Sequence, residues 1–259
     1  MNYGLYISAT GVLASIYRQD VIANNLANVN TTGFKRDLVT FKQRDAVRQE
    51  DGLSFMDSNA MLEKLGGGVH VGKTRIDFGQ GPLEASNSDF DFAIQNNGFF
   101  VVRMDGDSRG EHFAFTRDGR MTLDTRNRLV LATNGKPVLD VNDRPIVLDP
   151  TYDISVQADG GIMQNGKMVA MIQLADFPDH TQLHKQGHGL FTASENALNN
   201  RKPAEGTIRQ GFLEQSTVDP IVSMMEIADA GRMAQANANM MRYHDQMIQR
   251  AASTLGRVV

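Results

Sequence analysis

The chain has 259 residues, 41% of them hydrophobic, which is enough for a sizeable core in one or two domains. Its formal net charge of -4 and its lack of a Lys/Arg run argue against a nucleic-acid surface, and no apolar run approaches the ~18 residues of a membrane span. Cysteine is absent, which excludes disulfides and thiolate sites and leaves the compartment open. The N-terminus lacks a basic region followed by an uninterrupted apolar one, so we expect no cleaved signal peptide.

The first predicted element is an amphipathic helix over residues 3–28. Its apolar stripe recurs at steps of three and four residues, with Asp20 as its charged member: Tyr6, Ala9, Leu13, Ile16, Ala23 and Ala27. At 1.5 Å per residue the helix would be roughly 39 Å long. Gly33 is expected to close it as a C-terminal breaker.

A polar arm is expected over residues 34–80, with a modest strand at 69–78. From Gly81 onward, short apolar stretches alternate with turn signals, which is typical of an all-β domain of hairpins. The predicted strands are 99–104, 128–132, 137–141, 145–148, 154–157 and 168–175. The turn pairs between them are Asn97-Gly98, Asp118-Gly119, Asn134-Gly135, Asp159-Gly160 and Asn165-Gly166.

A second long helix is predicted over residues 218–255, with two apolar stripes. One contains Met233, Ala236, Met240, Tyr243, Met247 and Ala251, and the other contains Ala230, Ala234, Met241, Ile248 and Leu255. Because Ala and Met form thin apolar faces, each helix alone should be marginal in water, so ordering and assembly would be one event. The alternative is that the two helices simply pair within one globular chain.

These elements predict an α+β fold with a discontinuous helical region. We assign residues 1–32 and 217–259 to a terminal coiled-coil region, 33–80 to a connecting arm with β segments, and 81–216 to a central, mostly antiparallel β domain.

Acidic and histidine residues are the candidates for catalytic and metal sites. His180, His184 and His188 have the four-residue spacing that would align imidazoles on a helix, near Asp176 and Asp179. Pro178 and two glycines nevertheless disfavour a helix there. The acidic turn 105–110 has Arg109 where a calcium loop needs an oxygen ligand, so it is predicted as a hairpin tip. We therefore predict no catalytic residue, no metal site, no cofactor and no enzymatic activity.

Blocks spread along the chain carry a family resemblance. They are Asp20-Val-Ile-Ala-Asn-Asn-Leu-Ala-Asn28, Thr32-Gly-Phe-Lys35, Asp91-Phe-Ala-Ile-Gln-Asn-Asn-Gly-Phe-Phe100, Phe115-Thr-Arg-Asp-Gly119, Leu129-Val-Leu-Ala-Thr-Asn-Gly135 and Gln210-Gly-Phe-Leu-Glu-Gln-Ser-Thr-Val218. In this order they resemble the flagellar rod and hook proteins. The length and the single central β domain resemble the rod subunits. The segment Val218-Asp-Pro220 resembles the proximal rod type and favours it slightly over the distal type, which the arm and Phe41 resemble.

The resemblance implies a non-enzymatic building block that stacks helically into the hollow drive shaft of the periplasmic rod in the basal body. It also implies partners: copies of the chain, other rod subunits, nearby hook and ring proteins, and the flagellar export apparatus during secretion. Nucleic acid and direct membrane insertion are not expected. The alternative is a hook-associated or secreted β-domain module for binding or adhesion that oligomerises through its helices.

The terminal helices are the expected assembly interface, with asparagines setting helix register as polar residues do in coiled-coil seams. The candidate residues are Leu13, Ile16, Asp20, Ala23, Asn24, Asn25, Leu26, Asn28, Phe34, Met225, Arg232, Met233, Asn237, Met240 and Met247. Lys35, beside Phe34, is a further candidate for contact with a neighbouring subunit. Gly98, Phe99 and Phe100 are expected to be turn and core residues of the β domain.

Overall fold

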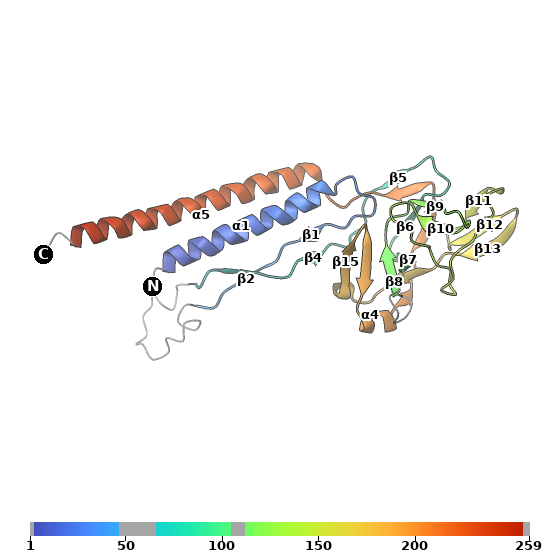
Figure 1. Ribbon diagram of the computed structural model, residues 1–259, viewed down its shortest axis with the longest axis horizontal. Coiled ribbons are helices and arrows are strands. Elements are labelled where there is room, and N and C mark those ends of the chain that lie inside the picture. The colour runs from blue at the N-terminus through green and yellow to red at the C-terminus, as the bar shows by residue number, and fades with distance from the viewer. Residues whose placement is uncertain (1–2, 47–65, 105–111, 256–259) are drawn as a thin grey trace. The chain divides into compact units, whose positions relative to one another are not determined.

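The computed structural model describes residues 3–46, 66–104 and 112–255 (Figure 1). The chain forms two compact units. Unit 1 comprises Met1–Ala27, Asp37–Arg75 and Asp219–Val259, and unit 2 comprises Asn28–Arg36 and Ile76–Val218. The order of elements along the chain, with an N-terminal helix, a run of mostly antiparallel strands and a C-terminal helix, confirms the predicted α+β class. Among the described residues, no helix combines the length and apolar character needed to cross a membrane.

Unit 1 is built on two long helices, α1 (Tyr3–Ala27) and α5 (Pro220–Leu255). They lie side by side and run in opposite directions (Figure 1). The short strands β2 (Phe41–Gln43) and β3 (Val69–Val71) pair antiparallel, with β3 next to α1. β1 (Asp37–Leu38) also belongs to this unit, and β4 (Arg75–Ile76) crosses into unit 2. The predicted strand at 69–78 is thus broken at Gly72, whose N–H donates to the Thr40 carbonyl.

The start of α5 is set by the residue before it, Asp219, and by its first residue, Pro220. The carboxylate of Asp219 accepts hydrogen bonds from the N–H groups of Ile221 and Val222, at 2.8 and 3.1 Å. These donors have no partner inside a helix, so the side chain caps them. Pro220 follows at the first helical position, where its missing N–H costs nothing.

The end of α1 differs from the prediction. The helix stops at Ala27, one residue before the predicted end, and the Thr31 N–H turns back to the Asn28 carbonyl, so Gly33 is not the residue that closes it. Gly33 does adopt a positive φ of 67°, but for another reason. A Cβ there would lie 2.5 Å from the carbonyl carbon of Arg117, so the residue allows two backbones of unit 2 to touch.

Unit 2 contains the β region. Its strands and short helices are β5 (Leu83–Ala85), β6 (Phe92–Gln95), β7 (Phe99–Met104), β8 (His112–Thr116), β9 (Met121–Leu123), β10 (Leu129–Leu131), β11 (Ile154–Val156), β12 (Gly161–Gln164), β13 (Lys167–Met171), β14 (Leu174–Asp176), η2 (His180–Gln182), β15 (Leu183–Gly187), β16 (Leu190–Ala193), α4 (Glu195–Asn199), β17 (Lys202–Pro203), β18 (Thr207–Gln210) and β19 (Phe212–Glu214). The largest sheet has the order β15-β16-β8-β7-β14-β17. Smaller sheets pair β10 with β9, β18 with β6 and β19 with β5, and place β12 between β11 and β13.

Strand β7 organises the core of unit 2. Successive side chains of a strand point to opposite faces. Phe100 and Val102 therefore enter one hydrophobic cluster, while Phe99 and Val101 enter another. Because both faces of β7 are covered along its first four residues, these residues form a continuous apolar run instead of an alternating one. The predicted core roles of Phe99 and Phe100 are confirmed, since both side chains are buried.

Several predicted strands are shortened or split. The stretch 168–175 divides into β13 and β14, and 137–141 and 145–148 form isolated bridges such as Leu139 with Pro145. The hairpin turn at Asn165-Gly166 is confirmed: both residues have positive φ, 49° and 72°, as a tight turn between β12 and β13 needs. The predicted hairpin tip at 105–110 lies outside the described residues, as do residues 47–65 of the predicted arm.

Candidate assembly interface

The helices of unit 1 face each other through small and polar residues. A Cβ on Gly4 would lie 2.6 Å from the His244 ring, and one on Gly11 would lie 2.8 Å from the Asn237 amide. Between these glycines, Ser8 is buried and returns its hydroxyl to the Gly4 carbonyl at 2.9 Å. Glycines therefore leave the space that these two α5 side chains occupy, and the helices approach closely without large apolar residues at these points.

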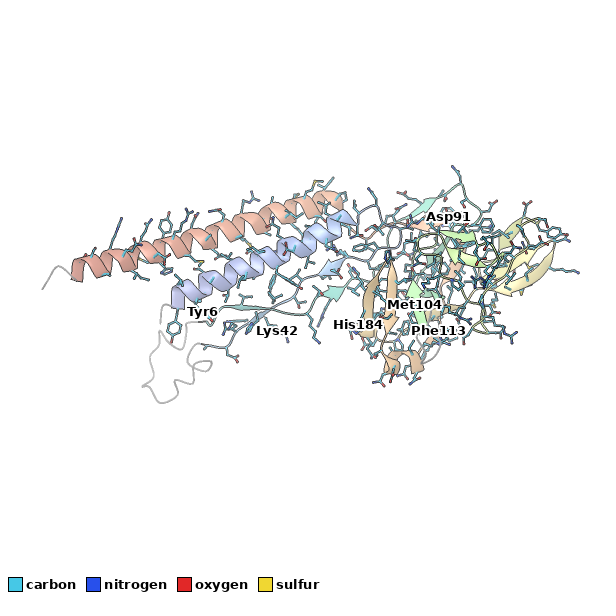
Figure 2. All side chains as sticks on the ribbon, in the orientation of Figure 1. Tyr6, Lys42, Asp91, Met104, Phe113 and His184 are labelled. Atoms are coloured by element: carbon cyan, nitrogen blue, oxygen red, sulfur yellow. The ribbon has the colours of Figure 1, made fainter. Side chains whose placement is uncertain are left out.

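Two large apolar residues of α1 point elsewhere. Tyr6 and Leu13 are two residues beyond Gly4 and Gly11, about 200° further round a helix of 3.6 residues per turn. They are 60% and 65% exposed. Figure 2 shows the Tyr6 ring projecting from α1 on the side away from α5. Tyr6 and Leu13 are thus left for contacts outside this helix pair.

Helix α5 also exposes an apolar row. Met233, Met240 and Met247 are seven residues apart, which places them on one face of the helix. They are 54%, 50% and 57% exposed. We call these three residues the outer methionine row.

The predicted interface residues fall into groups by exposure. The exposed ones are Leu13, Ile16, Asp20, Ala23, Asn24, Met225, Arg232, Met233, Met240 and Met247. The partly covered ones are Leu26, Asn28, Phe34 and Asn237, and Asn25 is buried. Most of the candidates therefore present surface that a second chain could cover.

Several of the polar candidates have partners inside the chain, Asn25 and Arg232 among them. The Asn25 amide donates to the Asp37 carbonyl at 2.8 Å, and its oxygen accepts the Asp37 N–H at 2.9 Å. Asn25 thereby satisfies both hydrogen-bonding groups of the Asp37 backbone, where the chain turns back along α1. Arg232 pairs with Asp229 one turn earlier on α5. Both side chains of that pair are exposed, so it contributes little to stability.

Phe34 and Lys35 belong to unit 2, where Lys35 is only 1% exposed. The expectation that Lys35 contacts a neighbouring subunit is wrong. Its ammonium donates to the Gly79 carbonyl at 2.7 Å and to Glu214 Oε1 at 2.5 Å. The Phe34 ring lies under Lys185, whose ammonium is 4.1 Å from the ring centroid. The segment following α1 is thus bound into unit 2.

Glu214 is the centre of this buried ion cluster. Its Oε1 also accepts the Gly81 N–H at 2.9 Å, and its Oε2 accepts Arg117 Nη1 at 3.1 Å. The other terminal nitrogen of the guanidinium, Nη2, donates to the Asn96 carbonyl at 2.8 Å. Burial lowers the pKa of Lys35 and of Arg117, while the Glu214 carboxylate opposes both shifts. Its partners make a buried charge tolerable here.

The cluster joins distant motifs. Lys35, Arg117 and Glu214 come from three of the sequence blocks quoted above, and unit 2 brings them into direct contact. Sequence reasoning identified the blocks but did not identify these three residues as partners. A charged residue inside an otherwise apolar or glycine-rich block was the available signal.

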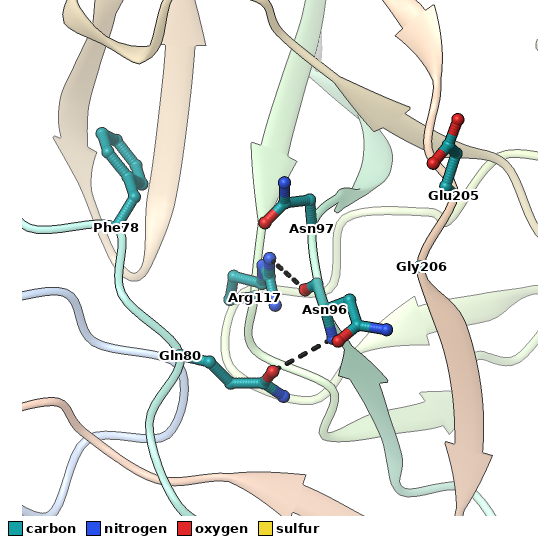
Figure 3. A pocket seen from close by; sticks show the side chains of 7 residues that line it. All are labelled: Phe78, Gln80, Asn96, Asn97, Arg117, Glu205 and Gly206. Atoms are coloured by element: carbon teal, nitrogen blue, oxygen red, sulfur yellow. Dashed lines mark hydrogen bonds between the residues drawn. The ribbon is translucent and has the colours of Figure 1, made fainter.

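A polar pocket of about 440 Å³ lies next to this cluster in unit 2. Arg117 forms part of its wall, between Gln80 and the Asn96-Asn97 turn (Figure 3). The Gln80 side chain bridges the Ile94 carbonyl and the Asn96 N–H, both at 3.0 Å. The pocket's polar groups thus hold the turn that leads into β7.

The histidine segment does not form a helix with aligned imidazoles. His180 lies in η2, His184 on β15, and His188 in the turn after it. The His180 ring contacts Asp176 at 3.1 Å. Across residues 3–46, 66–104 and 112–255, no group of three His, Asp or Glu side chains could hold a metal ion.

Three family descriptions match the chain. "Flagella basal body rod protein" matches residues 5–35, "Flagellar hook protein FlgE/F/G D1 domain" matches 93–164, and "Flagellar basal body rod FlgEFG protein C-terminal" matches 209–254. The first includes Lys35, the second covers Arg117, and the third includes Glu214. Each member of the ion cluster therefore comes from a different matched region.

Whole-chain relatives agree with these matches. The flagellar basal-body rod protein FlgF of Caulobacter vibrioides is 31% identical over all of both chains. The rod protein FlgG of Buchnera aphidicola subsp. Schizaphis graminum is 31% identical over 95% of this chain and 97% of that one. The FlgF of Mesorhizobium japonicum is 29% identical over 99% of each. These relatives are named as rod proteins and not as enzymes, and the chain belongs to the family of flagellar basal-body rod proteins.

Proposed function

We propose that this protein is a structural subunit of the flagellar basal-body rod, and that copies join through the outward apolar faces of α1 and α5. The observation that carries the proposal is that α1 and α5 contact each other through small and polar residues and leave large apolar residues exposed. Small and polar residues such as Gly11 and Asn237 meet inside the chain, while Leu13 and Met240 are 65% and 50% exposed. Exposed apolar residues along a helix mark a surface that another chain can bury.

A rod built in this way fits the chemistry of the exposed residues. Large apolar side chains supply most of the association free energy when they are covered. Asp20 and Arg232 are exposed beside them and offer charges that favour one alignment over others. Asn24, which is exposed on α1, would help to set register in the same interface, whereas Asn237 would set the register of α5 against α1 within the chain.

The assembly would be the hollow periplasmic shaft that transmits torque from the motor to the hook. Other rod subunits, and nearby hook and ring proteins, would be its neighbours, and the flagellar export apparatus would deliver the chain. The proximal position in the rod is slightly preferred, because Val218-Asp219-Pro220 resembles the proximal type. The FlgF and FlgG names of the relatives support a rod subunit of either kind.

The test is electron microscopy of basal bodies from a strain of the source bacterium with an in-frame deletion of this gene. We expect a missing or shortened rod, and the point at which it stops would distinguish the proximal from the distal position. Intact rods bearing normal hooks would contradict the proposal and favour a hook-associated or secreted binding module.

Two substitutions make the test specific to the helix faces. Leu13→Glu, returned to the deletion strain, should fail to restore rods, because it places a charge on the face to be covered. Val169→Glu on β13 is the matched control, since Val169 is also an exposed apolar residue, at 47%, but belongs to unit 2. If both variants restore rods equally well, the α1 face is not an interface.

A further inference from the structure

The sulfur chemistry of this chain is confined to methionine. The sequence contains 14 methionines and no cysteine. The outer methionine row on α5 exposes each of its three side chains by half or more, whereas Met121 in the core of unit 2 is 4% exposed. A thioether reacts with peroxide where the oxidant can reach it, so exposure makes this row a reactive surface.

Oxidation would make this surface more polar. A thioether is an apolar side chain, and its sulfoxide is polar and chiral. Because Met233, Met240 and Met247 share one helix face, three oxidations would convert that whole apolar row into a polar one. Met and Leu have similar volumes, so leucine can replace methionine there without offering an oxidisable sulfur.

We propose that the outer methionine row is an oxidation site for peroxide, and that its oxidation blocks self-assembly of the free subunit. This inference rests on the proposed function, since it concerns the same interface. In each reaction the sulfur lone pair attacks one peroxide oxygen, the O–O bond breaks and an S–O bond forms. Hydrogen peroxide is reduced to water while the thioether is oxidised to sulfoxide.

The assembled state should resist the same reaction. Side chains covered by a neighbouring copy are out of reach of the oxidant, so assembly protects the row and oxidation acts on subunits that have not yet joined. A dithiol reductant with methionine sulfoxide reductases reverses the change, because the sulfoxide oxygen leaves as water while the dithiol becomes a disulfide.

The experiment uses the purified full-length chain and hydrogen peroxide. Peptide mass spectrometry maps the sulfoxides, and sedimentation measures the protein concentration at which assemblies form. We expect oxidation at the outer methionine row to raise that concentration about tenfold or more. Reduction of the sulfoxides should restore the original value.

Matched variants identify the row as the cause. Met224 and Met225 are also exposed on α5, so both are replaced by leucine in a common background. In that background the triple variant Met233→Leu, Met240→Leu, Met247→Leu should assemble after peroxide treatment as it does before, while the background alone should stay sensitive. Met168→Leu, at an equally exposed position on β13 in unit 2, should remain as sensitive as the native chain. If the leucine variant does not assemble, peroxide mapping of native assemblies decides: slower oxidation of the row than of Met168 supports the inference.

Other outcomes separate the two proposals. Native protein that assembles equally well with the row fully oxidised would overturn the inference and leave the rod function intact. Basal bodies that keep intact rods after deletion of the gene would overturn the rod function itself. Equal oxidation of Met168 and the row in the assembled state would show that the row is not covered, which also overturns the inference.

Discussion

Gly33 shows how a single residue can hold two segments of unit 2 together. Its φ is 67°, and a Cβ would lie 2.6 Å from the Asp118 nitrogen. Gly135 has nearly the same φ, 68°, but within the described structure a Cβ there would meet no atom within 4 Å. The two sites therefore share the backbone penalty for an L-residue and differ in the space around it.

We predict that Gly33→Ala destabilises the protein more than Gly135→Ala does. A positive φ costs either alanine about 1–2 kcal/mol, and the clash with fixed backbone should add about 2 kcal/mol or more at residue 33. Urea unfolding of both variants, followed by near-ultraviolet circular dichroism, measures the difference. Equal losses of stability would mean that the chain around Arg117 yields easily.

Glu214 should be the least replaceable member of the buried ion cluster. Glu214→Gln leaves the charges of Lys35 and Arg117 buried without their carboxylate, and removing one partner of such a group costs about 3–5 kcal/mol. Glu84→Gln is the control, since Glu84 is exposed on the strand that pairs with β19 and should change stability by about 0.5 kcal/mol at most. Chemical unfolding at neutral pH compares the two variants, and similar stabilities would show that the cluster is dispensable.

Asp77 gives unit 2 part of its sensitivity to acid. The pKa of Asp77 lies below its ordinary 3.8. The larger cause is the hydrogen bond that its carboxylate accepts from the Gly79 N–H, and a smaller one is the hydrogen bond and charge of the Arg36 guanidinium. A carboxylate with a lowered pKa stabilises the fold above the unfolded pKa, and this stabilisation is lost as pH falls through the folded value. The Asp77→Asn variant should be less stable than the native protein at about pH 5. The difference between their free energies of unfolding should shrink as the pH falls from about 5 toward about 2. A deficit that stays constant over this range would contradict the assignment.

The limits of sequence reasoning are visible in these residues. Phe99 and Phe100 were predictable as core because an apolar run between turn signals has few other uses. Lys35 was not, because a lysine in a sequence gives no sign that a carboxylate 179 residues away will neutralise it. Burial of a charge depends on a partner, and partners distant in sequence meet only in the fold.

At the scale of elements, helices were predicted more accurately than strands. The predicted helices at 3–28 and 218–255 match α1 and α5 closely because their periodicity extends over many turns. The strands at 137–141 and 145–148 were not recovered, since these segments form isolated bridges around turns. Periodicity also gave the apolar stripes of both helices, but it could not show that the glycine face of α1 would meet α5.

The cap of α5 provides the prediction at this scale. Asp219→Ala removes the acceptor for two free N–H groups and should destabilise unit 1 by about 0.5–2 kcal/mol. Asp219→Asn keeps an oxygen acceptor and should recover most of the loss. Asp245→Ala, exposed later on α5, is the control for loss of a charge alone. Thermal unfolding followed by far-ultraviolet circular dichroism tests the order, and a loss in Asp245→Ala as large as that in Asp219→Ala would contradict the capping role.

At the scale of the whole molecule, the buried hydrophobic clusters and the exposed apolar faces of the long helices belong to different units. Unit 2 has its own hydrophobic clusters and its own buried ion cluster, while unit 1 carries the exposed apolar faces. A subunit of this kind can keep one part folded whether or not its neighbours are present. The helices of unit 1 would gain much of their stability only when another copy covers them.

The predicted domain limits at residues 32, 80 and 216 stay a prediction, and two fragments test them against the compact units. Fragment 28–218 retains Lys35 and Gly79 beside Glu214, whereas fragment 81–216 lacks both and leaves Arg117 as the cation on Glu214. We expect the longer fragment to unfold cooperatively and at a higher urea concentration, because it keeps the buried carboxylate fully bonded.

Lys35→Met in fragment 28–218 separates the charge from the rest of the added chain. The variant fragment should be less stable to urea than the unsubstituted fragment 28–218. It should still be more stable than fragment 81–216, because it keeps contacts such as the hydrogen bond from the Thr217 N–H to the Phe34 carbonyl, at 3.1 Å. If fragment 81–216 is instead as stable as 28–218, the segment after α1 is not part of the folded β unit. Lys35→Met would then leave the urea midpoint of the longer fragment unchanged, because the ammonium would contribute nothing to its stability.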